Sequence, residues 1–302
     1  MMSNMIPEFL HQKLLKQYGE ELTDNIIEGY SVKRKVTLRV NTLKTDTDKI
    51  KEVLTNSNIE FKEVSWSREA LIIENVDESE IRKLPIYENG GIYLQSLSSM
   101  LPAIVLNPKA DENILDMAAA PGGKTTQMSA LSENKALITA CEKNKIRAER
   151  LRYNIEKQGA NRVNILTEDA RNLDSYFSFD KILLDAPCSG SGTINIENDS
   201  LEKIFTEELI HRSIKTQYEL LKKAVSILKS GHEMVYSTCS ILEEENEKNI
   251  EKILKSPNVE LVPIEEKLFD DITLLSTKLH GTIVVAPSEL YEGFFIAKLR
   301  KE

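Results

Sequence analysis

The sequence predicts an α/β fold built on a Rossmann-like, doubly wound and mostly parallel sheet. From Asn113 onward, strand-sized apolar runs alternate with helical segments, which is the pattern of parallel strands joined by helices. A glycine turn follows the first of these strands, and acidic residues or cysteines follow the others. Open α/β sheets bind their ligands at the carboxyl ends of the strands, so the same residues mark the candidate site.

The composition is that of an ordinary globular protein. The chain has 302 residues, with 41% hydrophobic and 29% charged residues, which is enough for one large domain or a principal domain with a small one. No apolar run approaches the roughly 18 residues that a membrane span needs. Residues 1–18 mix charged and apolar side chains as an amphipathic helix does, unlike a secretion signal. We therefore expect a cytoplasmic protein with no membrane association.

We expect two domains, residues 1–90 and residues 91–302. The first is predicted to be a small α+β domain and to pack against the second, because no low-complexity linker separates them. Its expected elements are two short helices within 6–30 broken at Gly19, strands at 36–41 and 71–74, and a helix at 47–56. A further short strand is expected at 92–95, just after the boundary.

The second domain is expected to carry the parallel sheet. Its predicted strands are 113–117, 136–141, 163–166, 181–185 and 234–238, and its predicted helices are 123–132, 145–158, 207–228 and 244–255. A closing hairpin of residues 282–286 and 294–299 is expected to add antiparallel strands at an edge of the sheet. We assign the acidic residues 243–245 and 247 only the role of favouring the start of the last helix.

A turn of small residues after the first strand indicates a nucleotide-like cofactor. Here the strand ending at Asp116 is followed by a loop and the start of a helix, where free backbone amides can approach a ligand closely. Glu142 follows the second strand and is placed to accept hydrogen bonds from ribose hydroxyls. Asp169 follows the third strand and could reach an adenine edge, although both carboxylates could instead cap helices. The predicted cofactor contacts are Ala118, Ala119, Ala120, Pro121, Gly122, Gly123, Lys124, Glu142, Arg147, Asp169 and Asp185.

A phosphate-binding loop for ATP is the competing interpretation of the same turn. Residues 118–125 nearly match the pattern G-x-x-x-x-G-K-[ST], with Ala118 in place of the first glycine. Pro121 removes an amide donor from such a loop, and the strand ending at Asp185 continues with Pro-Cys rather than with a magnesium-binding group. The pattern therefore favours another nucleotide-like cofactor over ATP.

Three cysteines are spread along the chain at intervals of about 50 residues. This number and spacing fit neither a disulfide framework nor a zinc site, and the four histidines are equally scattered, so we expect reduced thiols and no metal. Cys141 is expected to be an inert core residue. Cys188 and Cys239 follow predicted strands within Asp-Ala-Pro-Cys-Ser-Gly and Ser-Thr-Cys-Ser, which favours a chemical role for both.

Taken together, these motifs resemble the Nol/Nop/Sun family of S-adenosylmethionine-dependent RNA cytosine-5 methyltransferases. The similar segments span roughly residues 30–300 in order: 38–42, 95–102, 115–125, 185–190, 237–240 with 245–247, and 293–299. The resemblance implies a class I methyltransferase domain and S-adenosylmethionine as the cofactor. It also implies a substrate cytosine in ribosomal or transfer RNA.

The resemblance assigns roles to three side chains. Carbon 5 of cytosine becomes nucleophilic once a thiolate adds at carbon 6, and by resemblance Cys239 is that thiolate. Asp185 holds or protonates nitrogen 3, and Cys188 assists release of the product. We add the hypothesis that Lys124 lies near Cys239 and favours its thiolate form.

Two alternatives stay open. DNA cytosine methyltransferases use a Pro-Cys nucleophile, a role that Pro187-Cys188 would also fit, but the second thiol in Ser-Thr-Cys favours the RNA enzyme. The other alternative is a catalytically idle RNA-binding or ribosome-assembly factor with the same fold. The intact Asp185, Cys188 and Cys239 favour an enzyme.

The net charge of −9 is not that of a typical nucleic-acid-binding protein, so RNA contacts are sought in local clusters. We predict that the domain of residues 1–90 binds RNA through Lys33, Arg34, Arg39 and Asn41, because cationic side chains dominate binding to the RNA backbone. Trp66 is expected to pack this domain. Met117 stands where the family commonly has cysteine, which is expected to change packing only. Asn195, Ile196 and Ser288 also depart from residues common in the family, which leaves the RNA target open. Nothing in the chain demands more than a monomer.

Overall fold

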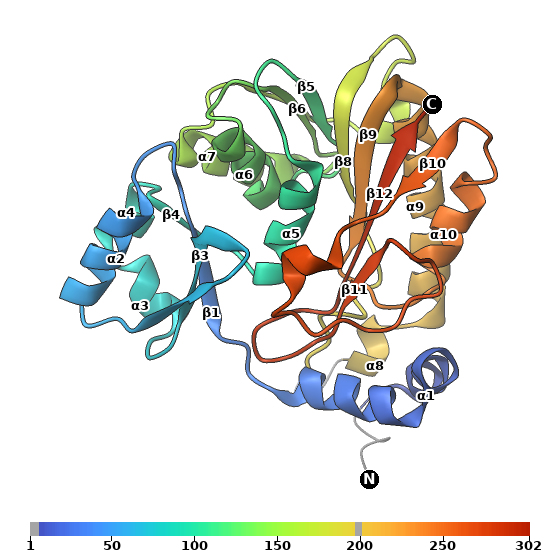
Figure 1. The fold of residues 1–302 in the computed structure, drawn as a ribbon, viewed down its shortest axis with the longest axis horizontal. Coiled ribbons are helices and arrows are strands. Elements are labelled where there is room, and N and C mark those ends of the chain that lie inside the picture. The colour runs from blue at the N-terminus through green and yellow to red at the C-terminus, as the bar shows by residue number, and fades with distance from the viewer. Residues whose placement is uncertain (1–5, 197–200) are drawn as a thin grey trace. The chain divides into compact units, whose positions relative to one another are not determined.

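The fold is described from a computed structural model that covers residues 6–196 and 201–302 (Figure 1). The chain divides into two compact units, which we describe separately. Unit A comprises residues 35–183 and 227–229, and unit B comprises the described residues of 1–34, 184–226 and 230–302.

Unit A begins with a small antiparallel sheet. Its strands are β1 (Val36–Val40), β2 (Phe61–Val64), β3 (Ser67–Ile73) and β4 (Ile92–Leu94), in the order β2-β3-β1-β4. The helices α2 (Thr47–Asn56), α3 (Glu78–Arg82) and α4 (Pro85–Glu88) gather beside this sheet (Figure 1). Ile50 and Leu54 of α2, Ile81 and Ile86 pack with Leu38 in one apolar core. The burial of these side chains holds the helices on the sheet.

The rest of unit A is a set of parallel strands with intervening helices. The strands β5 (Asn113–Asp116), β6 (Leu137–Cys141) and β7 (Val163–Leu166) pair in parallel, and β5 also pairs in parallel with β8 (Phe179–Asp185) up to Leu183. The helices are α5 (Leu97–Leu106), α6 (Gly123–Leu131) and α7 (Lys145–Gln158), with a 3-10 turn at Ala170–Asn172. The carboxyl ends of β5 and β6 therefore lie side by side, which sets the positions of the loops that follow them.

The small sheet is tied to these parallel elements by buried polar contacts within unit A. The side-chain amide of Asn41 donates to the carbonyl of Gln158 at 2.8 Å, and the amide of Gln158 donates to the carbonyl of Ile92 at 3.1 Å. Both side chains are buried. Asn41, in the predicted small domain, therefore contacts the helix that ends at Gln158, in the predicted second domain.

Unit B contains a second set of antiparallel strands and two helices of more than 20 residues. Its elements are α1 (Glu8–Ser31), α8 (Leu201–Ile204), α9 (Glu207–Ile227), β9 (Leu228–Thr238), α10 (Glu247–Ile253), β10 (Val259–Val262), a 3-10 turn at Glu266–Phe269, β11 (Ile283–Val285) and β12 (Phe294–Lys301). β12 pairs antiparallel with both β9 and β10, and β11 pairs with β12. Within unit A the parallel strands follow the order β8-β5-β6-β7, and within unit B the antiparallel strands follow the order β10-β12-β9.

Helix α1 is anchored to the loop regions of unit B. The hydroxyl of Tyr18 donates to the carbonyl of Ile241 at 2.6 Å, and the hydroxyl of Tyr30 donates to the carbonyl of Ser191 at 2.5 Å. Gly19 interrupts the helix with φ 79° and ψ 177°, so the predicted break is confirmed. Glycine is suited to this position because a side chain disfavours positive φ.

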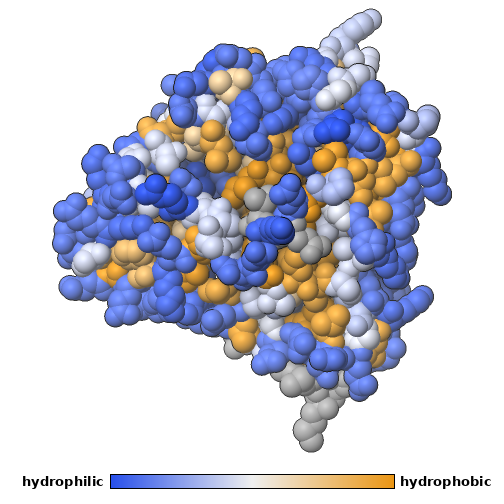
Figure 2. Space-filling view, viewed as in Figure 1, coloured by the Kyte–Doolittle hydropathy of each residue, from blue (hydrophilic) through white to orange (hydrophobic). Residues whose placement is uncertain are grey.

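Polar and charged residues cover much of the face seen in Figure 2, while the core of both units is aliphatic and aromatic. In the described part of the chain, no helix combines the length and apolarity that crossing a membrane requires.

Most predicted elements are confirmed, and three expectations need correction. The hairpin strand at 294–299 is not at an edge, because β10 pairs with its outer side. The strands β2 and β10 and the helices α3, α4, α5 and α8 were not predicted from the sequence. The last predicted helix begins at Glu247 rather than at 244, because residues 243–246 form a turn in which Glu245 and Asn246 are buried. The domain boundary at residue 90 stays a prediction.

Candidate active site

Two thiols meet in unit B. Cys188 follows β8 and Cys239 follows β9, and their Sγ atoms lie 3.1 Å apart, within hydrogen-bonding distance for sulfur. Both side chains are partly buried. Backbone hydrogen bonds join the two loops, from the amide of Ala186 to the carbonyl of Ser237 at 2.8 Å and from the amide of Gly192 to the carbonyl of Cys239 at 2.9 Å. The predicted pairing of these cysteines is therefore present in the fold.

The two thiols differ in environment. The hydrogen bond with Cys239, followed by burial, raises the pKa of the Cys188 thiol well above its ordinary value. A nearby carboxylate, that of Glu245, acts in the same direction. Cys188 therefore holds its proton at neutral pH and can donate a hydrogen bond to the sulfur of Cys239.

Asp185 lies at the end of β8, three residues before Cys188. The hydroxyl of Ser237 donates to its Oδ1 at 2.7 Å, and its side chain is partly exposed. Ser237 precedes Cys239 by two residues on β9. The carboxylate is thus held between the two strands that carry the thiols.

A buried glutamate, expected from the sequence only to favour the start of a helix, joins the two cysteine loops. Glu245 is 0% exposed and accepts hydrogen bonds from Ser189, Gln217 and Ser240. The run of charged residues at 243–247 made a solvated helix start the simpler interpretation. The Glu-Asn-Glu segment of the family resemblance was the one signal in the sequence that could have singled out this residue.

The predicted cofactor loop lies in unit A. It connects β5 to α6, and Gly122 caps the helix with φ 110°, where a Cβ atom would approach the Leu151 side chain to 3.0 Å. The amide of Ala119 donates to the carbonyl of Cys141 at 2.9 Å, which ties the loop to the end of β6. The loop thus has a backbone shape that favours glycine and a wall of small side chains.

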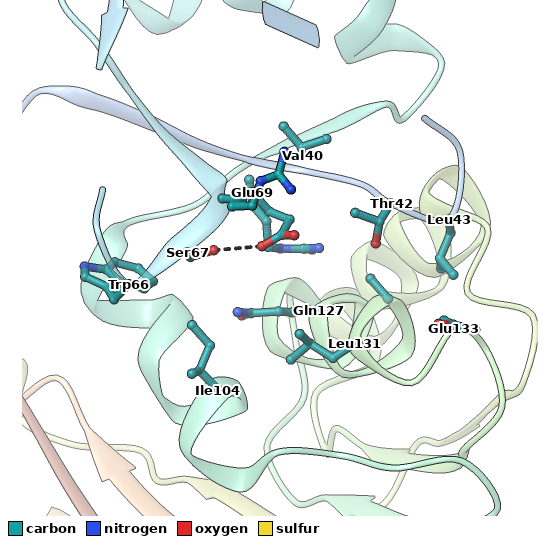
Figure 3. Close-up of a pocket in the computed structure, with 13 residues that line it drawn as sticks. Val40, Thr42, Leu43, Trp66, Ser67, Glu69, Ile104, Gln127, Leu131 and Glu133 are labelled. Carbon is teal, nitrogen blue, oxygen red and sulfur yellow. Dashed lines mark hydrogen bonds between the residues drawn. The ribbon is translucent and has the colours of Figure 1, made fainter. Parts of the chain in front are cut away.

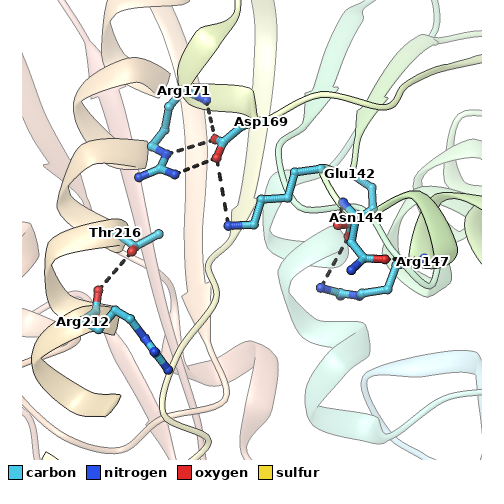
Figure 4. Close-up of polar contacts among 8 residues, drawn as sticks. Glu142, Asn144, Arg147, Asp169, Arg171, Arg212 and Thr216 are labelled. Atoms are coloured by element: carbon cyan, nitrogen blue, oxygen red, sulfur yellow. Dashed lines mark hydrogen bonds and ion pairs between the residues drawn. The ribbon is translucent and has the colours of Figure 1, made fainter. Parts of the chain in front are cut away.

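Glu142 and Arg147 flank this loop (Figure 4). Glu142 is 4% exposed; one carboxylate oxygen accepts from the amide of Asn144 at 2.8 Å and the other lies 3.5 Å from Nη1 of Arg147. Nη2 of Arg147 donates to the carbonyl of Ala120 at 2.7 Å. Three predicted cofactor residues are therefore linked by direct contacts.

Asp169 is engaged differently. Its carboxylate caps the 3-10 turn by accepting from the amide of Arg171 at 3.1 Å, and it also accepts from the guanidinium at 3.0 Å and 2.6 Å (Figure 4). These hydrogen bonds with Arg171 hold the pKa of Asp169 below its usual range. The capping alternative weighed for this residue is realised in the structure, and its contact with an adenine stays a prediction.

The phosphate-loop alternative conflicts with the contacts of Thr125. In an ATP-binding loop this hydroxyl would serve a magnesium ion. Here Thr125 is 0% exposed and its hydroxyl donates to Oδ2 of Asp116 at 2.7 Å. Lys124, predicted to lie near Cys239, donates to the hydroxyl of Ser99 at 2.7 Å within unit A; its relation to Cys239 stays a prediction.

Two of the four predicted RNA contacts are buried. Arg39 is 3% exposed, donates to Oε1 of Gln95 and to the hydroxyl of Thr126, both at 3.0 Å, and lies over the Tyr93 ring. Asn41 is 1% exposed. The structure corrects the expectation for both, because their side chains serve the packing of unit A. Lys33 is exposed and Arg34 partly exposed, so their contacts with RNA stay predictions.

Cys141 is fully buried, which confirms its assignment to the core. Burial, reinforced by neighbouring carboxylates, raises its pKa from 9.0 to about 12. Within the described residues no group of three or more histidine, cysteine or acidic side chains could hold a metal ion.

A separate cavity of about 590 Å³ lies in unit A (Figure 3). Its lining residues come from the small sheet and from α5 and α6: Arg39, Val40, Thr42, Leu43, Trp66, Ser67, Arg68, Glu69, Ile104, Gln127, Ala130, Leu131 and Glu133. None of the predicted catalytic or cofactor residues is among them. Trp66 borders this cavity, beside the hydrogen bond between Ser67 and Glu69.

Comparisons with known proteins identify relatives over nearly the whole chain. A protein of Shewanella sp. (strain ANA-3) named ribosomal RNA small subunit methyltransferase F is 34% identical over 97% of this chain. The 25S rRNA (cytosine-C(5))-methyltransferase nop2 of Schizosaccharomyces pombe is also 34% identical over 97% of it. The chain spans 62% and 50% of the length of these two relatives.

Solved structures agree with this relationship. A methyltransferase homologue from Pyrococcus horikoshii has a TM-score of 0.83 and 33% identity, covering 98% of this chain and all of that one. The structure of NSun6 from the same organism with SFG has a TM-score of 0.85 and 25% identity, covering 99% of both chains. The Rossmann-like α/β fold is thereby confirmed.

Two family models match separate parts of the chain. Residues 6–77 match the ferredoxin-like domain of RsmF/B-like methyltransferases, and residues 103–300 match the 16S rRNA methyltransferase RsmB/F model. The second match alone covers more than half of the chain and includes both cysteine loops and the cofactor loop. This chain belongs to the 16S rRNA methyltransferase RsmB/F family.

Proposed function

We propose that this chain is an S-adenosylmethionine-dependent RNA cytosine-5 methyltransferase that acts on ribosomal or transfer RNA through a covalent adduct with Cys239. The observation that carries the proposal is the 3.1 Å contact between Cys188 and Cys239 in a member of an rRNA methyltransferase family. The relatives named above are rRNA methyltransferases, and nop2 of Schizosaccharomyces pombe is a cytosine-C(5)-methyltransferase by name. An adduct mechanism needs one thiol to attack and another group to manage a proton, and this pair supplies both.

The cofactor loop fits S-adenosylmethionine. The small side chains of 118–123 leave the backbone accessible, and Glu142 sits at the end of the neighbouring strand with Arg147 linking it to the loop. In our proposal Glu142 receives the ribose hydroxyls and the loop lies against the amino-acid part of the ligand. When bound, the cofactor supplies a methyl group activated by its sulfonium charge.

The residues of unit B would prepare the cytosine. The Cys239 thiolate forms a bond to carbon 6 of the ring, while Asp185 holds or protonates nitrogen 3, so that electron density accumulates on carbon 5. After carbon 5 has gained its methyl group, the proton on that carbon is released to solvent, and its electron pair forms the double bond between carbons 5 and 6. The bond between sulfur and carbon 6 breaks as this double bond forms, which restores the aromatic ring. Cys188 assists this release.

The raised pKa of Cys188 supports this division of labour over the alternative in which Cys188 attacks. A thiol that stays protonated is a poor nucleophile, because the thiolate is the reactive form. It can, however, donate a hydrogen bond or a proton to the sulfur of Cys239. Cys239 is therefore the better candidate for the nucleophile.

The direct test is methyl transfer from labelled S-adenosylmethionine to bulk RNA, followed by bisulfite sequencing of the product. We expect label in RNA as 5-methylcytosine, and none with Cys239→Ala. RNA binding without methyl incorporation under conditions that support a known relative would instead favour the idle assembly factor. A radiolabel at a position other than carbon 5 of cytosine would overturn the reaction type.

The hypothesis that Lys124 favours the Cys239 thiolate has its own test. Lys124→Met should shift the pH dependence of methyl transfer toward higher pH, because a cation near a thiol lowers the pKa of that thiol. An unchanged pH profile would remove Lys124 from the mechanism.

A further inference from the structure

Glu245 occupies a closed site between the two cysteine loops. One carboxylate oxygen accepts from the backbone amide of Ser189 at 2.8 Å and from the side-chain amide of Gln217 at 2.9 Å. The other accepts from the hydroxyls of Ser189 at 2.5 Å and Ser240 at 2.6 Å. Within the described chain, no cationic side chain lies within ion-pair distance of this carboxylate. Four donors therefore satisfy both oxygens without a counter-charge.

The donors come from both sides of the thiol pair. Ser189 is the residue after Cys188, and Ser240 is the residue after Cys239. Gln217 lies on α9 and also donates to the carbonyl of Pro187 at 3.0 Å, so it contacts the first loop independently. A single carboxylate thus connects the two peptide segments whose sulfur atoms meet.

A second group of buried contacts holds the glutamate itself. The hydroxyl of Tyr236 donates to the backbone carbonyl of Glu245 at 2.7 Å, and Asn249 donates to the same carbonyl at 3.2 Å and to Oε1 of Gln217 at 3.1 Å. Tyr236 and Asn249 are both 0% exposed. Hydrogen bonds therefore hold both the backbone of Glu245 and its carboxylate in place, as a positioning residue requires.

We propose that Glu245 is a positioning residue that sets the approach of Cys188 to Cys239. The proposal rests on the proposed function for its effect on catalysis, but its structural part concerns the thiol pair alone. A side chain that only filled space would not need a donor from each loop. Loss of the carboxylate is expected to let the loops separate, so that Cys239 can still attack while Cys188 is no longer placed to assist release.

The central variant is Glu245→Gln. It keeps the size of the side chain but replaces one carboxylate oxygen by an NH₂ group. The hydrogens of that group must then face two other donors, either the hydroxyls of Ser189 and Ser240 or the amides of Ser189 and Gln217. The matched control is Glu244→Gln, the preceding residue, which is partly exposed and forms an ion pair with Lys13 at 3.0 Å. Both variants remove one negative charge from the same run, so a difference between them reports the position of the charge rather than its loss.

The first measurement does not depend on methyl transfer. Phenylarsine oxide condenses with two neighbouring thiols to give one arsenic atom bonded to both sulfurs, with loss of one water, and it binds single thiols only weakly. We expect the wild type and Glu244→Gln to bind one equivalent tightly, and Glu245→Gln to bind at least about tenfold more weakly, because the second bond gains from preorganisation. Equal affinity in all three proteins would overturn the positioning role.

The second measurement follows the reaction. For Glu245→Gln we expect kcat to fall about 100-fold, as a misplacement near 1 Å can cause, with KM for RNA unchanged and with covalent protein–RNA adduct accumulating. A general loss of folded protein would lower the amount of covalent adduct and the turnover rate together. The ratio of adduct to turnover therefore distinguishes a misplaced Cys188 from a destabilised protein. An unchanged ratio of adduct to turnover contradicts the proposal.

A second variant keeps the test decisive if Glu245→Gln does not fold. The double substitution Ser189→Ala with Ser240→Ala retains the carboxylate but removes the two hydroxyl donors, and should weaken arsenical binding in the same direction. Wild-type affinity in this double variant counts against the proposal. If the arsenical results agree with it while even the wild type transfers no methyl group, the proposed function fails and the positioning role of Glu245 stands.

Discussion

The sulfur atoms of Cys188 and Cys239 lie 3.1 Å apart although 51 residues separate them in the chain. Their proximity follows from backbone pairing just beyond the ends of β8 and β9, where Ala186 bonds to Ser237 and Gly192 bonds to Cys239. Side-chain contacts through Glu245 add to that pairing. The reactive geometry is thus a property of two strand ends rather than of one flexible loop.

Replacing the two cysteines one at a time should give opposite phenotypes. Cys239→Ala is expected to abolish the covalent RNA adduct and methyl transfer, because no thiolate remains to add to carbon 6. Cys188→Ala is expected to let the adduct accumulate, because release is impaired after attack. Denaturing electrophoresis with labelled RNA measures both. Adduct formation by Cys239→Ala but not by Cys188→Ala would reverse the assignment of the nucleophile.

Glu142 should matter for cofactor affinity. Glu142→Gln removes a charged acceptor proposed for the ribose hydroxyls and its ion pair with Arg147. The expected rise in the Kd for S-adenosylmethionine is about tenfold, the effect of losing roughly 1.4 kcal/mol from hydrogen bonds to a charged group. Isothermal titration calorimetry measures this, with the exposed Glu149→Gln on α7, the helix that follows Glu142, as the control. Equal Kd values for both variants would place the ribose elsewhere.

Cys141 should make the protein sensitive to alkali. Its pKa is raised from 9.0 to about 12, so between these values an unfolded chain loses the thiol proton while the fold retains it. The contribution of the protonated Cys141 thiol to the free energy of unfolding is therefore complete below pH 9. It decreases as the pH rises, by up to about 1.4 kcal/mol per pH unit. The difference in unfolding free energy between wild type and Cys141→Ala should shrink from about pH 7.5 to about pH 10. A pH-independent difference would show that this thiol does not titrate as described.

Arg39 should act on stability rather than on RNA affinity. Arg39→Met leaves Oε1 of Gln95 without its donor, and the expected loss of unfolding free energy is roughly 1–3 kcal/mol. The affinity of the folded variant for RNA should match that of the wild type, because the side chain is buried. Arg68→Met, on an exposed arginine of the neighbouring strand, is the control for stability. Urea titrations and filter binding measure the two quantities, and normal stability with lost RNA affinity would favour a direct RNA contact instead.

Helices and strands with a clear periodicity of apolar residues could be predicted from the sequence, whereas those defined by tertiary contacts could not. The helices Thr47–Asn56 and Lys145–Gln158 and the strand Val163–Leu166 occur as predicted, since each has its own apolar pattern and start or stop signal. β10 was missed because it has four residues and only its pairing with β12 makes it a strand.

The candidate site divides in the same way. The meeting of Cys188 with Cys239 could be predicted because neighbouring strand ends converge in an open sheet. Arg39 and Glu245 could not be predicted correctly. A charged side chain is normally exposed, and only the tertiary structure shows that these two have buried polar partners.

The position of β12 determines when the two cysteine loops can be completed as the chain is synthesised. β12 lies between β9 and β10. Gly293, the residue just before β12, donates its backbone amide to the carbonyl of Gly192. The two backbones are so close that a Cβ atom on Gly192 would lie 1.9 Å from the carbonyl oxygen of Gly293. Gly192 in turn bonds to Cys239. During synthesis both cysteines leave the ribosome well before Gly293, so the loops lack this support until β12 has emerged and inserted. A nascent chain is therefore expected to have an unfinished thiol pair and to acquire its activity late in translation.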